Sequence, residues 1–318
     1  MSAGPHASCY KDQPAVTLES DTLAAQFLPG IGAKLCSLVY KPTGTELFVQ
    51  RPAPEYRQAP YDGDYVAQGE CSGFDDMFPA IDRGFYESYP WRGTPIPDHG
   101  EVWSLPWECS GQDADLHFSV HGVRFPYRLE KSVRFTADGA LRSSYRLTNL
   151  SSFDFDFMWA AHIMLNLEEG AVLTLPDGVS QICTALRFHG SLGDYGDTLT
   201  WPVATLADGS TRDLSHLRPK TTGDAVKYFV KGRMPQGWCA LTYPANRFTL
   251  RLAFPAEQVP YFAVLPNEGG WQHLYSIFLE PATASFDRLE VARLRGECST
   301  VKAHATYDWY LDLQLTRS

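Results

Sequence analysis

The sequence predicts an all-β fold, in which antiparallel strands form a β-sandwich with few short helices as one domain over residues 1–318. Two observations predict it. Residues 127–135 and 141–149 each alternate apolar and polar side chains, and Ala137-Asp138-Gly139 joins them, which is the pattern of a β-hairpin. No helical period persists for more than about three turns. Because 44% of the 318 residues are hydrophobic and no repeat or linker interrupts them, we expect two packed sheets around a large core.

The N-terminal part is expected to open as a β-meander. Turn residues, among them Ser20-Asp21 and Pro29-Gly30-Ile31-Gly32, separate short segments that are rich in strand-forming side chains. Consecutive segments of this kind usually pair with one another. The predicted strands are residues 16–19, 22–28, 34–40 and 46–49.

Residues 51–107 lack this alternation. They are rich in Pro, Gly, Tyr, Asp and Arg, and they are too long for a simple connection within a compact domain. Their aromatic content argues against disorder. We therefore expect this segment to form an ordered wall of a binding site.

A strand expected over residues 153–162 determines where one histidine points. The aromatic residues at positions 153, 155, 157 and 159 share one face, because side chains alternate along a strand. His162 falls on the other face, together with Asp154 and Asp156. Unless a bulge shifts this register, His162 faces away from the aromatic core.

The C-terminal half returns to short strands. Pro281 is expected to end the strand at residues 274–280, because proline cannot donate a hydrogen bond to a neighbouring strand. One helix is expected from Phe286 to Arg295, with Ser285 as its cap and Gly296 at its end. The other predicted strands are residues 226–230, 238–243, 248–254 and 307–315.

Charge and the absence of targeting signals exclude several classes of function. The formal net charge of -10 and the lack of a basic stripe argue against a nucleic-acid partner. The N-terminus lacks the basic and apolar regions of a signal peptide, and no apolar stretch is long enough to span a bilayer. The seven cysteines are scattered without a Cys-x-x-Cys pair, which is typical of reduced thiols and predicts no zinc site. We expect a cytoplasmic protein without a metal or a membrane partner.

The segment 97–107 carries the first candidate for chemistry. It places His99 between Asp98 and Glu101, adds two tryptophans, and has Gly100 where the backbone can turn sharply. One interpretation is a surface loop that the tryptophans anchor and in which His99 makes a structural hydrogen bond. The other is an active-site loop, because His162 and Glu280 elsewhere in the chain are suitable partners.

Glu280 is the second candidate. It lies at the end of an apolar strand and before a proline, where partial desolvation raises the pKa of a carboxyl group toward that of a general base. The alternative is a structural ion pair with Arg288.

Several segments, in this order and over nearly the whole chain, resemble the aldose 1-epimerase (galactose mutarotase) family: residues 28–35 and 43–47, the His99-Gly100 loop, the strand that ends in His162, and residues 279–283 ahead of 287–289. The resemblance implies an antiparallel β-supersandwich with an open sugar-binding cleft and no metal or nucleotide. It implies that His162 is the general acid at the ring oxygen, Glu280 the base at the anomeric hydroxyl and His99 a second partner of the ring oxygen.

The sequence departs from the family's pattern at two places, which indicates a divergent branch. Residues 73–79 stand where galactose mutarotases carry an Asn-Arg pair, and Lys227 lies where a sugar-binding aspartate is expected. Hydroxyl-rich ligands are bound by carboxylate acceptors, cationic donors and aromatic platforms. The candidates for substrate contact are therefore Asp75, Asp76, Glu101, Trp103, Lys227 and Trp271.

The predicted function is interconversion of the α and β anomers of a free sugar by a monomer or homodimer. An acid and a base that flank the sugar each contribute ~100- to 10,000-fold, so no cofactor is required. One alternative is a glycoside hydrolase that uses Glu101 and Glu280 at a separation of about 5 to 9.5 Å. A second is a hexose-6-phosphate 1-epimerase, which needs an arginine cluster. The candidate arginines for binding that phosphate are Arg83, Arg92 and Arg128. A third alternative is a carbohydrate-binding protein of the same fold without turnover.

Overall fold

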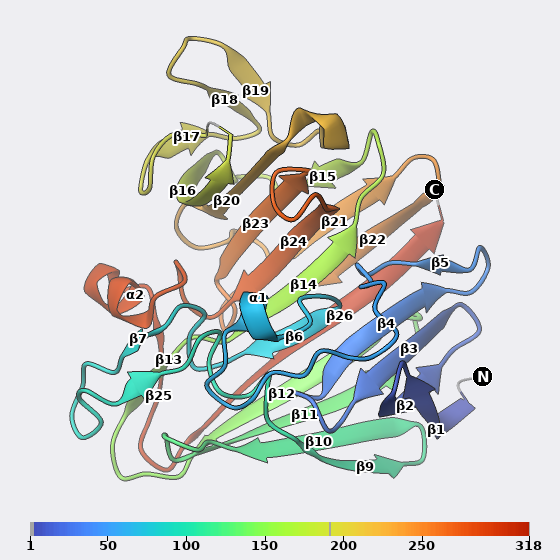
Figure 1. Cartoon of the computed structure of the whole chain (residues 1–318). Coiled ribbons are helices and arrows are strands. Elements are labelled where there is room, and N and C mark those ends of the chain that lie inside the picture. Colours follow the sequence, from blue (N-terminus) through green and yellow to red (C-terminus); the bar gives the residue numbers. More distant parts are fainter. Residues whose placement is uncertain (1–2, 191, 318) are drawn as a thin grey trace.

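Two large antiparallel sheets pack against each other in the computed structural model, which describes residues 3–190 and 192–317 (Figure 1). The larger sheet has twelve strands, with β5 (Thr45–Glu46) paired to β4 at one side. The other strands follow the order β1 (Ala3–Tyr10), β2 (Gln13–Glu19), β3 (Leu23–Leu28), β4 (Lys34–Tyr40), β6 (Phe74–Met77), β14 (Ala160–Asn166), β24 (Tyr275–Ala282), β23 (Tyr261–Glu268), β20 (Asp224–Val230), β16 (Gln181–His189) and β17 (Thr198–Thr200).

The smaller sheet has eight strands and covers one face of the larger sheet. Its order is β15 (Val172–Thr174), β21 (Trp238–Tyr243), β22 (Phe248–Ala253), β26 (Thr306–Arg317), β12 (Leu141–Asn149), β11 (Tyr127–Phe135), β10 (Asp115–His121) and β9 (Glu108–Gln112). Side chains from the two sheets meet in the core: the rings of Phe27 and Phe118 lie 5.6 Å apart, and those of Tyr145 and Trp159 lie 4.9 Å apart. The predicted all-β class is confirmed.

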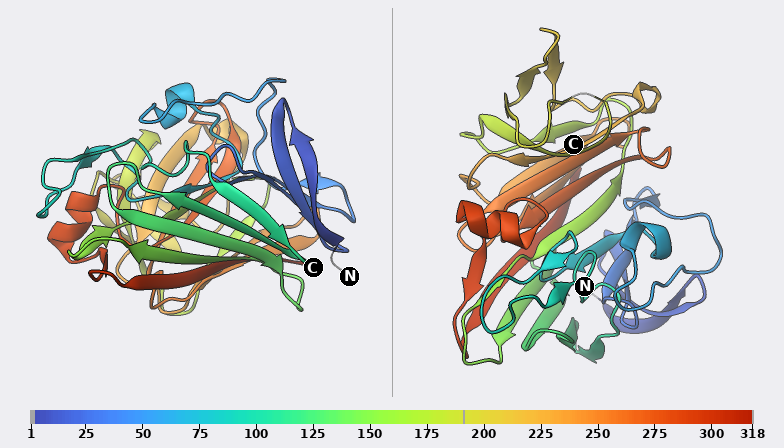
Figure 2. Two further views of the ribbon diagram at one scale, coloured as in Figure 1. Left: turned by 90° about the horizontal axis from the view of Figure 1, so that it is seen from below. Right: turned by 60° about the vertical axis from the view of Figure 1, so that its left-hand side comes forward.

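Short elements complete the chain. The pairs are β7 (Gly84–Phe85) with β8 (Pro95–Ile96), β13 (Phe155–Phe157) with β25 (Ser299–Val301), and β18 (Val203–Thr205) with β19 (Thr211–Asp213). The β18–β19 hairpin stands out from the end of the larger sheet in Figure 1 and in the right-hand view of Figure 2. The helices are α1 (Tyr65–Gln68), α2 (Leu289–Arg295) and the 3-10 turn η1 (Lys220–Thr222). Among the described residues no helix is long and apolar enough to cross a bilayer.

The hairpin predicted from alternation is present with the predicted boundaries. Strands β11 and β12 pair in a continuous register from Tyr127 opposite Asn149 to Phe135 opposite Leu141. Along β11 the residues at 127, 129, 131 and 133 are buried and those between them are more exposed. Period-two patterning therefore placed this hairpin correctly, because one face packs on the core and the other meets solvent.

The strand predicted over residues 153–162 is divided in the structure. β13 pairs with β25, whereas β14 begins at Ala160 and joins the larger sheet between β6 and β24. The two strands therefore belong to different sheets, and one alternation does not run through both. Phe155 and Phe157 are buried as expected, and His162 faces away from them for the separate reason given below.

Pro281 does not end its strand, so this prediction is wrong. β24 continues to Ala282, and Phe262 of β23 pairs with Pro281. On the other side, the register between β14 and β24 pairs Ala160 with Ala282 and then Ile163 with Leu279, so no residue of β14 is paired opposite the proline. A proline is tolerated within a strand where its missing N–H is not required by the ladder.

The predicted helix begins later than expected. α2 starts after Arg288 rather than at Phe286, and Ser285 does not cap it, because the Ser285 hydroxyl donates to the Glu297 carboxylate instead. The end is as predicted: Gly296 has φ +67 and its N–H bonds to the carbonyl of Ala292, a left-handed cap that glycine adopts without strain.

Candidate active site

A cavity opens on the face of the larger sheet that the smaller sheet does not cover. Across β14 and β6, His162 pairs with Asp75 and Ala161 pairs with Asp76. Because side chains alternate along a strand, Asp76 and Ala161 share the other face, where Asp76 binds Lys131 of β11 at 2.8 Å. His162 therefore points away from the smaller sheet.

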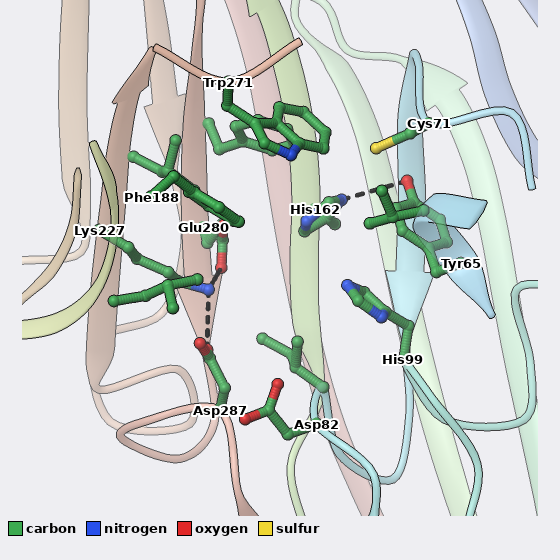
Figure 3. A pocket seen from close by; sticks show the side chains of 15 residues that line it. Tyr65, Cys71, Asp82, His99, His162, Phe188, Lys227, Trp271, Glu280 and Asp287 are labelled. Atoms are coloured by element: carbon green, nitrogen blue, oxygen red, sulfur yellow. Dashed lines mark hydrogen bonds and ion pairs between the residues drawn. The ribbon is translucent and has the colours of Figure 1, made fainter. Parts of the chain in front are cut away.

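The cavity holds about 490 Å3 of open space, part of it continuous with solvent. Strands β14, β16, β20, β23 and β24 form its floor, and the segment 51–107 forms one wall, as predicted (Figure 3). Its lining is Tyr65, Val66, Cys71, Ile81, Asp82, His99, His162, Leu186, Phe188, Lys227, Leu265, Trp271, Phe278, Glu280 and Asp287.

His99 and His162 come together at the wall of the cavity. Their ring centroids lie 5.4 Å apart with the planes at 82°. The Nδ1 of His99 lies 3.2 Å from Oδ2 of Asp98. His99 has φ +57, and a Cβ on Gly100 would lie 2.1 Å from the carbonyl oxygen of Phe78. The His99-Gly100 dipeptide is thus required by a close backbone approach, which aims His99 at the cavity.

Burial determines the charge of His162. The side chain is 7% exposed, and this desolvation, followed by the nearby charges of His99 and Lys227, holds the pKa of His162 well below 6.5. The imidazole is therefore neutral at neutral pH. Its Nδ1 lies 3.3 Å from the hydroxyl oxygen of Tyr65.

Glu280 lines the same cavity on β24, in a register with β14 that places it beside His162 (Figure 3). It does not pair with Arg288, which binds Glu290 at 2.6 Å. Its partner is Lys227, whose Nζ lies 2.6 Å from Oε2 of Glu280 and 2.7 Å from Oδ1 of Asp287. Burial raises the pKa of Glu280, and the attraction of Lys227 opposes this shift. The carboxylate is thus buried, oriented by a cation and directed at the cavity.

The predicted substrate contacts are divided between the cavity and the core. Lys227 and Trp271 line the cavity, and the Phe188 and Trp271 rings lie 5.6 Å apart at its rim. Asp75 does not line it, because its Oδ2 binds Nζ of Lys34 at 2.8 Å beneath Tyr65. Asp76 lies between the two sheets, as described above.

Glu101 and Trp103 also lie outside the cavity. Glu101 is fully buried and accepts hydrogen bonds from the hydroxyls of Tyr61 at 2.7 Å and Tyr127 at 2.9 Å. The indole N–H of Trp103 donates to the carbonyl oxygen of Asp98 at 2.9 Å, so this side chain anchors the His99 loop. Glu101 and Glu280 do not face a common space, and the two-carboxylate arrangement of a glycoside hydrolase is not formed by this pair.

The sequence comparisons and the structural comparisons differ in outcome. Neither a protein-family model nor a curated protein matches the sequence. Several solved structures match the fold over nearly the whole chain. A galactose mutarotase-like protein from Lactobacillus casei has a TM-score of 0.67 at 19% identity and covers 95% of this chain and 100% of its own. One from Clostridium acetobutylicum has a TM-score of 0.66 at 13% identity, with coverage of 99% and 98%.

The chain has the galactose mutarotase-like fold. The low identities show the fold and not the activity. A galactose mutarotase related enzyme from Lactobacillus acidophilus gives a similar match, with a TM-score of 0.64 at 15% identity over 94% of this chain and 97% of that one. The expected fold class is confirmed by these neighbours.

Three polar residues of the cavity were not among the predicted site residues. Tyr65 and Asp82 come from the irregular segment 51–107, where alternation gives no information about orientation. Asp287 was part of the segment that resembles the family, and its pairing with Lys227 could not be read from spacing. Within residues 3–190 and 192–317 no group of three or more His, Cys, Asp or Glu side chains is arranged to hold a metal ion.

Acidification is expected to destabilise the wild-type protein more than its His162→Gln variant. An unfolded chain titrates His162 near 6.5, whereas the folded pKa is lower. Below about pH 6.5 the unfolded state therefore binds more protons, and the free energy of unfolding falls as the pH falls. Chemical denaturation from about pH 7 to about pH 5 checks this. Parallel curves for the two proteins would contradict it.

Proposed function

We propose that the protein is an aldose 1-epimerase, an isomerase that interconverts the α and β anomers of a free sugar. The observation that carries the proposal is the placement of a buried, cation-oriented carboxylate, Glu280, in one cavity with two imidazoles. Opening a sugar ring needs a proton to leave the anomeric hydroxyl and another to reach the ring oxygen. A base at the anomeric hydroxyl and an acid at the ring oxygen supply both.

In the proposed mechanism Glu280 takes the proton of the anomeric hydroxyl. The imidazoles of His162 and His99 lie together on the ring-oxygen side, and the protonated form of this pair supplies the second proton. His162 is neutral in the free protein, and the carboxylate of Asp98 lies 3.2 Å from Nδ1 of His99. After rotation about the C1–C2 bond of the open-chain sugar, the ring closes by the reverse proton transfers. Each group therefore serves both as acid and as base.

The remaining lining fits the body of a sugar. Phe188 and Trp271 form an aromatic rim on which an apolar face of the ring can pack. Lys227 has three N–H donors, two of which are directed at Glu280 and Asp287. The third can serve a sugar hydroxyl, and the carboxyl group of Asp82 is an acceptor at the same end of the cavity.

Neutral aldoses are expected to be better substrates than their phosphates. Three carboxyl groups line the cavity against one lysine, and no arginine is among its lining residues. The three candidate arginines for a phosphate have other partners: Arg83 binds Asp62, Arg92 binds the carbonyl of Glu87, and Arg128 binds the carboxylate of Glu130. The repulsion from each uncompensated carboxylate costs a bound phosphate about 1 kcal/mol, which corresponds to a roughly fivefold lower kcat/KM for the phosphate.

Polarimetry with freshly dissolved α-glucose, α-galactose and glucose 6-phosphate tests the function and this preference together. We expect faster mutarotation of a neutral sugar than of the phosphate. Asp82→Asn should narrow the difference in rate between the neutral sugar and the phosphate, because it removes one negative charge from the cavity. The control Asp154→Asn, which lies on an exposed connection between strands, should leave that difference unchanged. A phosphate that is the best wild-type substrate would replace this proposal with the phosphosugar epimerase.

A further inference from the structure

Tyr65, the first residue of α1, contacts both histidines of the cavity. Its side chain is 2% exposed, and its ring stacks on that of His99 with centroids 4.3 Å apart and planes at 21°. Its hydroxyl oxygen lies 3.3 Å from Nδ1 of His162 (Figure 3). One residue thus lies between two groups that the proposed mechanism requires to act together.

The direction of the hydrogen bonds at the Tyr65 hydroxyl follows from its other partner. The hydroxyl oxygen lies 2.7 Å from Oδ2 of Asp75, and Nζ of Lys34 lies 2.8 Å from the same carboxylate oxygen. An ionised carboxylate only accepts, so the single phenolic proton is donated to Asp75. Burial and then the charge of Asp75 raise the pKa of Tyr65 well above 10, which keeps that proton on the phenol.

The phenolic oxygen is then left to accept a hydrogen bond, and Nδ1 of His162 is the donor beside it. A neutral imidazole carries one proton, so the proton of His162 lies on Nδ1 and Nε2 carries the lone pair. In Figure 3 the opposite edge of this ring faces the side of the cavity where Glu280 lies. The chain Lys34, Asp75, Tyr65 and His162 thus directs a proton-accepting nitrogen at the substrate space.

Tyr65 also holds the second histidine through its backbone. The N–H of Tyr65 donates to Oδ2 of Asp98 at 2.7 Å, and the same oxygen lies 3.2 Å from Nδ1 of His99. The short helix that carries Tyr65 is itself fixed, because the carboxylate of Asp64 accepts from the N–H of Ala67 at 2.6 Å. The ring, the hydroxyl and the backbone N–H of Tyr65 therefore all help to fix the positions of the two imidazoles.

We propose that Tyr65 is a positioning residue that fixes the Nδ1–H tautomer of His162 and holds His162 and His99 as one proton-transfer pair. The role in turnover rests on the proposed function, whereas the tautomer does not. Asp75 and Lys34 act through Tyr65: they orient its hydroxyl without touching the substrate space. The Asp75 carboxylate is thus assigned to positioning rather than to sugar contact.

Tyr65→Phe tests the proposal, because it removes the hydroxyl and keeps the ring stacked on His99 and the N–H to Asp98. Nitrogen-15 NMR of the histidine side chains should show Nδ1 of His162 protonated in the wild type and a mixture of tautomers in the variant. In anomer exchange we expect kcat to fall by about 10- to 100-fold with little change in KM, since a misassigned tautomer removes part of a general acid-base contribution.

Tyr243→Phe is the matched control. Tyr243 is also buried, and its hydroxyl donates at 2.9 Å to the carbonyl oxygen of Asn166, on the strand that carries His162. This variant should leave the His162 tautomer and kcat unchanged. A wild-type His162 protonated on Nε2, an unchanged tautomer in Tyr65→Phe, or an equal loss of kcat in both variants would overturn the proposal. A wild type without anomer exchange would contradict the proposed function and leave the NMR result to decide the tautomer.

Discussion

Replacing Glu280 with glutamine is expected to slow anomer exchange by at least about 100-fold, the lower end of the effect of a general base. The amide keeps the size of the carboxylate, and its oxygen can still accept from Nζ of Lys227, which lies 2.6 Å from Glu280 in the wild type. It cannot take up the proton of the anomeric hydroxyl. Sugar binding and the cooperativity of unfolding should change little, so the loss should appear in kcat.

The matched control for this variant is Glu290→Gln. Glu290 is a partly buried carboxylate bound to Arg288 at 2.6 Å, close in sequence to Glu280 but outside the cavity. It should retain the wild-type rate. A Glu280→Gln enzyme with most of its activity, or an equal loss in both variants, would remove Glu280 from the mechanism.

Lys131→Met is expected to lower the free energy of unfolding by about 3 to 5 kcal/mol, the usual cost of leaving one member of a buried ion pair without its partner. Lys131 and Asp76 are each about 2% exposed and lie 2.8 Å apart between the two sheets. Methionine is unbranched like lysine and only one atom shorter, so the missing charge dominates the loss of stability. The Nε1–H of Trp159, which also donates to Asp76, cannot replace it.

Urea denaturation measures this loss, and Lys302→Met provides the comparison. Lys302 binds Asp154 at the same 2.8 Å, but its side chain is 75% exposed, so its removal should cost less than about 1 kcal/mol. Similar losses in the two variants would show that burial does not set the strength of the Lys131 pair. Mutarotation per folded molecule should be unchanged in Lys131→Met, because the residue faces away from the cavity.

The positions and partners of Asp75 and Asp76 could not be predicted from the sequence. Two adjacent aspartates in a loop-like segment favoured contact with a sugar. The structure places them on the short strand β6, where they face opposite sides of the sheet and each binds a buried lysine from a distant segment. A strand of ion-paired residues lacks the apolar alternation by which strands are recognised, so neither β6 nor the two lysine partners could be predicted.

Strands with one solvated face were predictable, because apolar and polar residues alternate along them in step with burial, as in β11 and β12. The ends of strands that are buried on both faces were predicted less accurately. β24 is buried along nearly its whole length and continues through Pro281, and the break between β13 and β14 has no signature in residues 153–162. The division of that segment is set by tertiary pairing with β25 and β6, which a local pattern does not contain.

The cavity itself was predicted in part. His99, His162 and Glu280, with Lys227 and Trp271, come together as the resemblance and the strand ends implied. Tyr65, which lies between the two histidines, could not be found, because its position depends on the path of the long segment 51–107. A loop residue is oriented by contacts with the rest of the fold rather than by its neighbours in sequence.

The most direct test of the central claim is NMR exchange spectroscopy between the anomeric signals of a panel of neutral aldoses, with catalytic amounts of protein. The account predicts exchange between the α and β signals of at least one sugar that is faster than in buffer with wild type and close to the buffer rate with Glu280→Gln. Wild-type protein that binds a neutral sugar but leaves its exchange at the buffer rate across the panel would contradict the account and indicate a carbohydrate-binding protein.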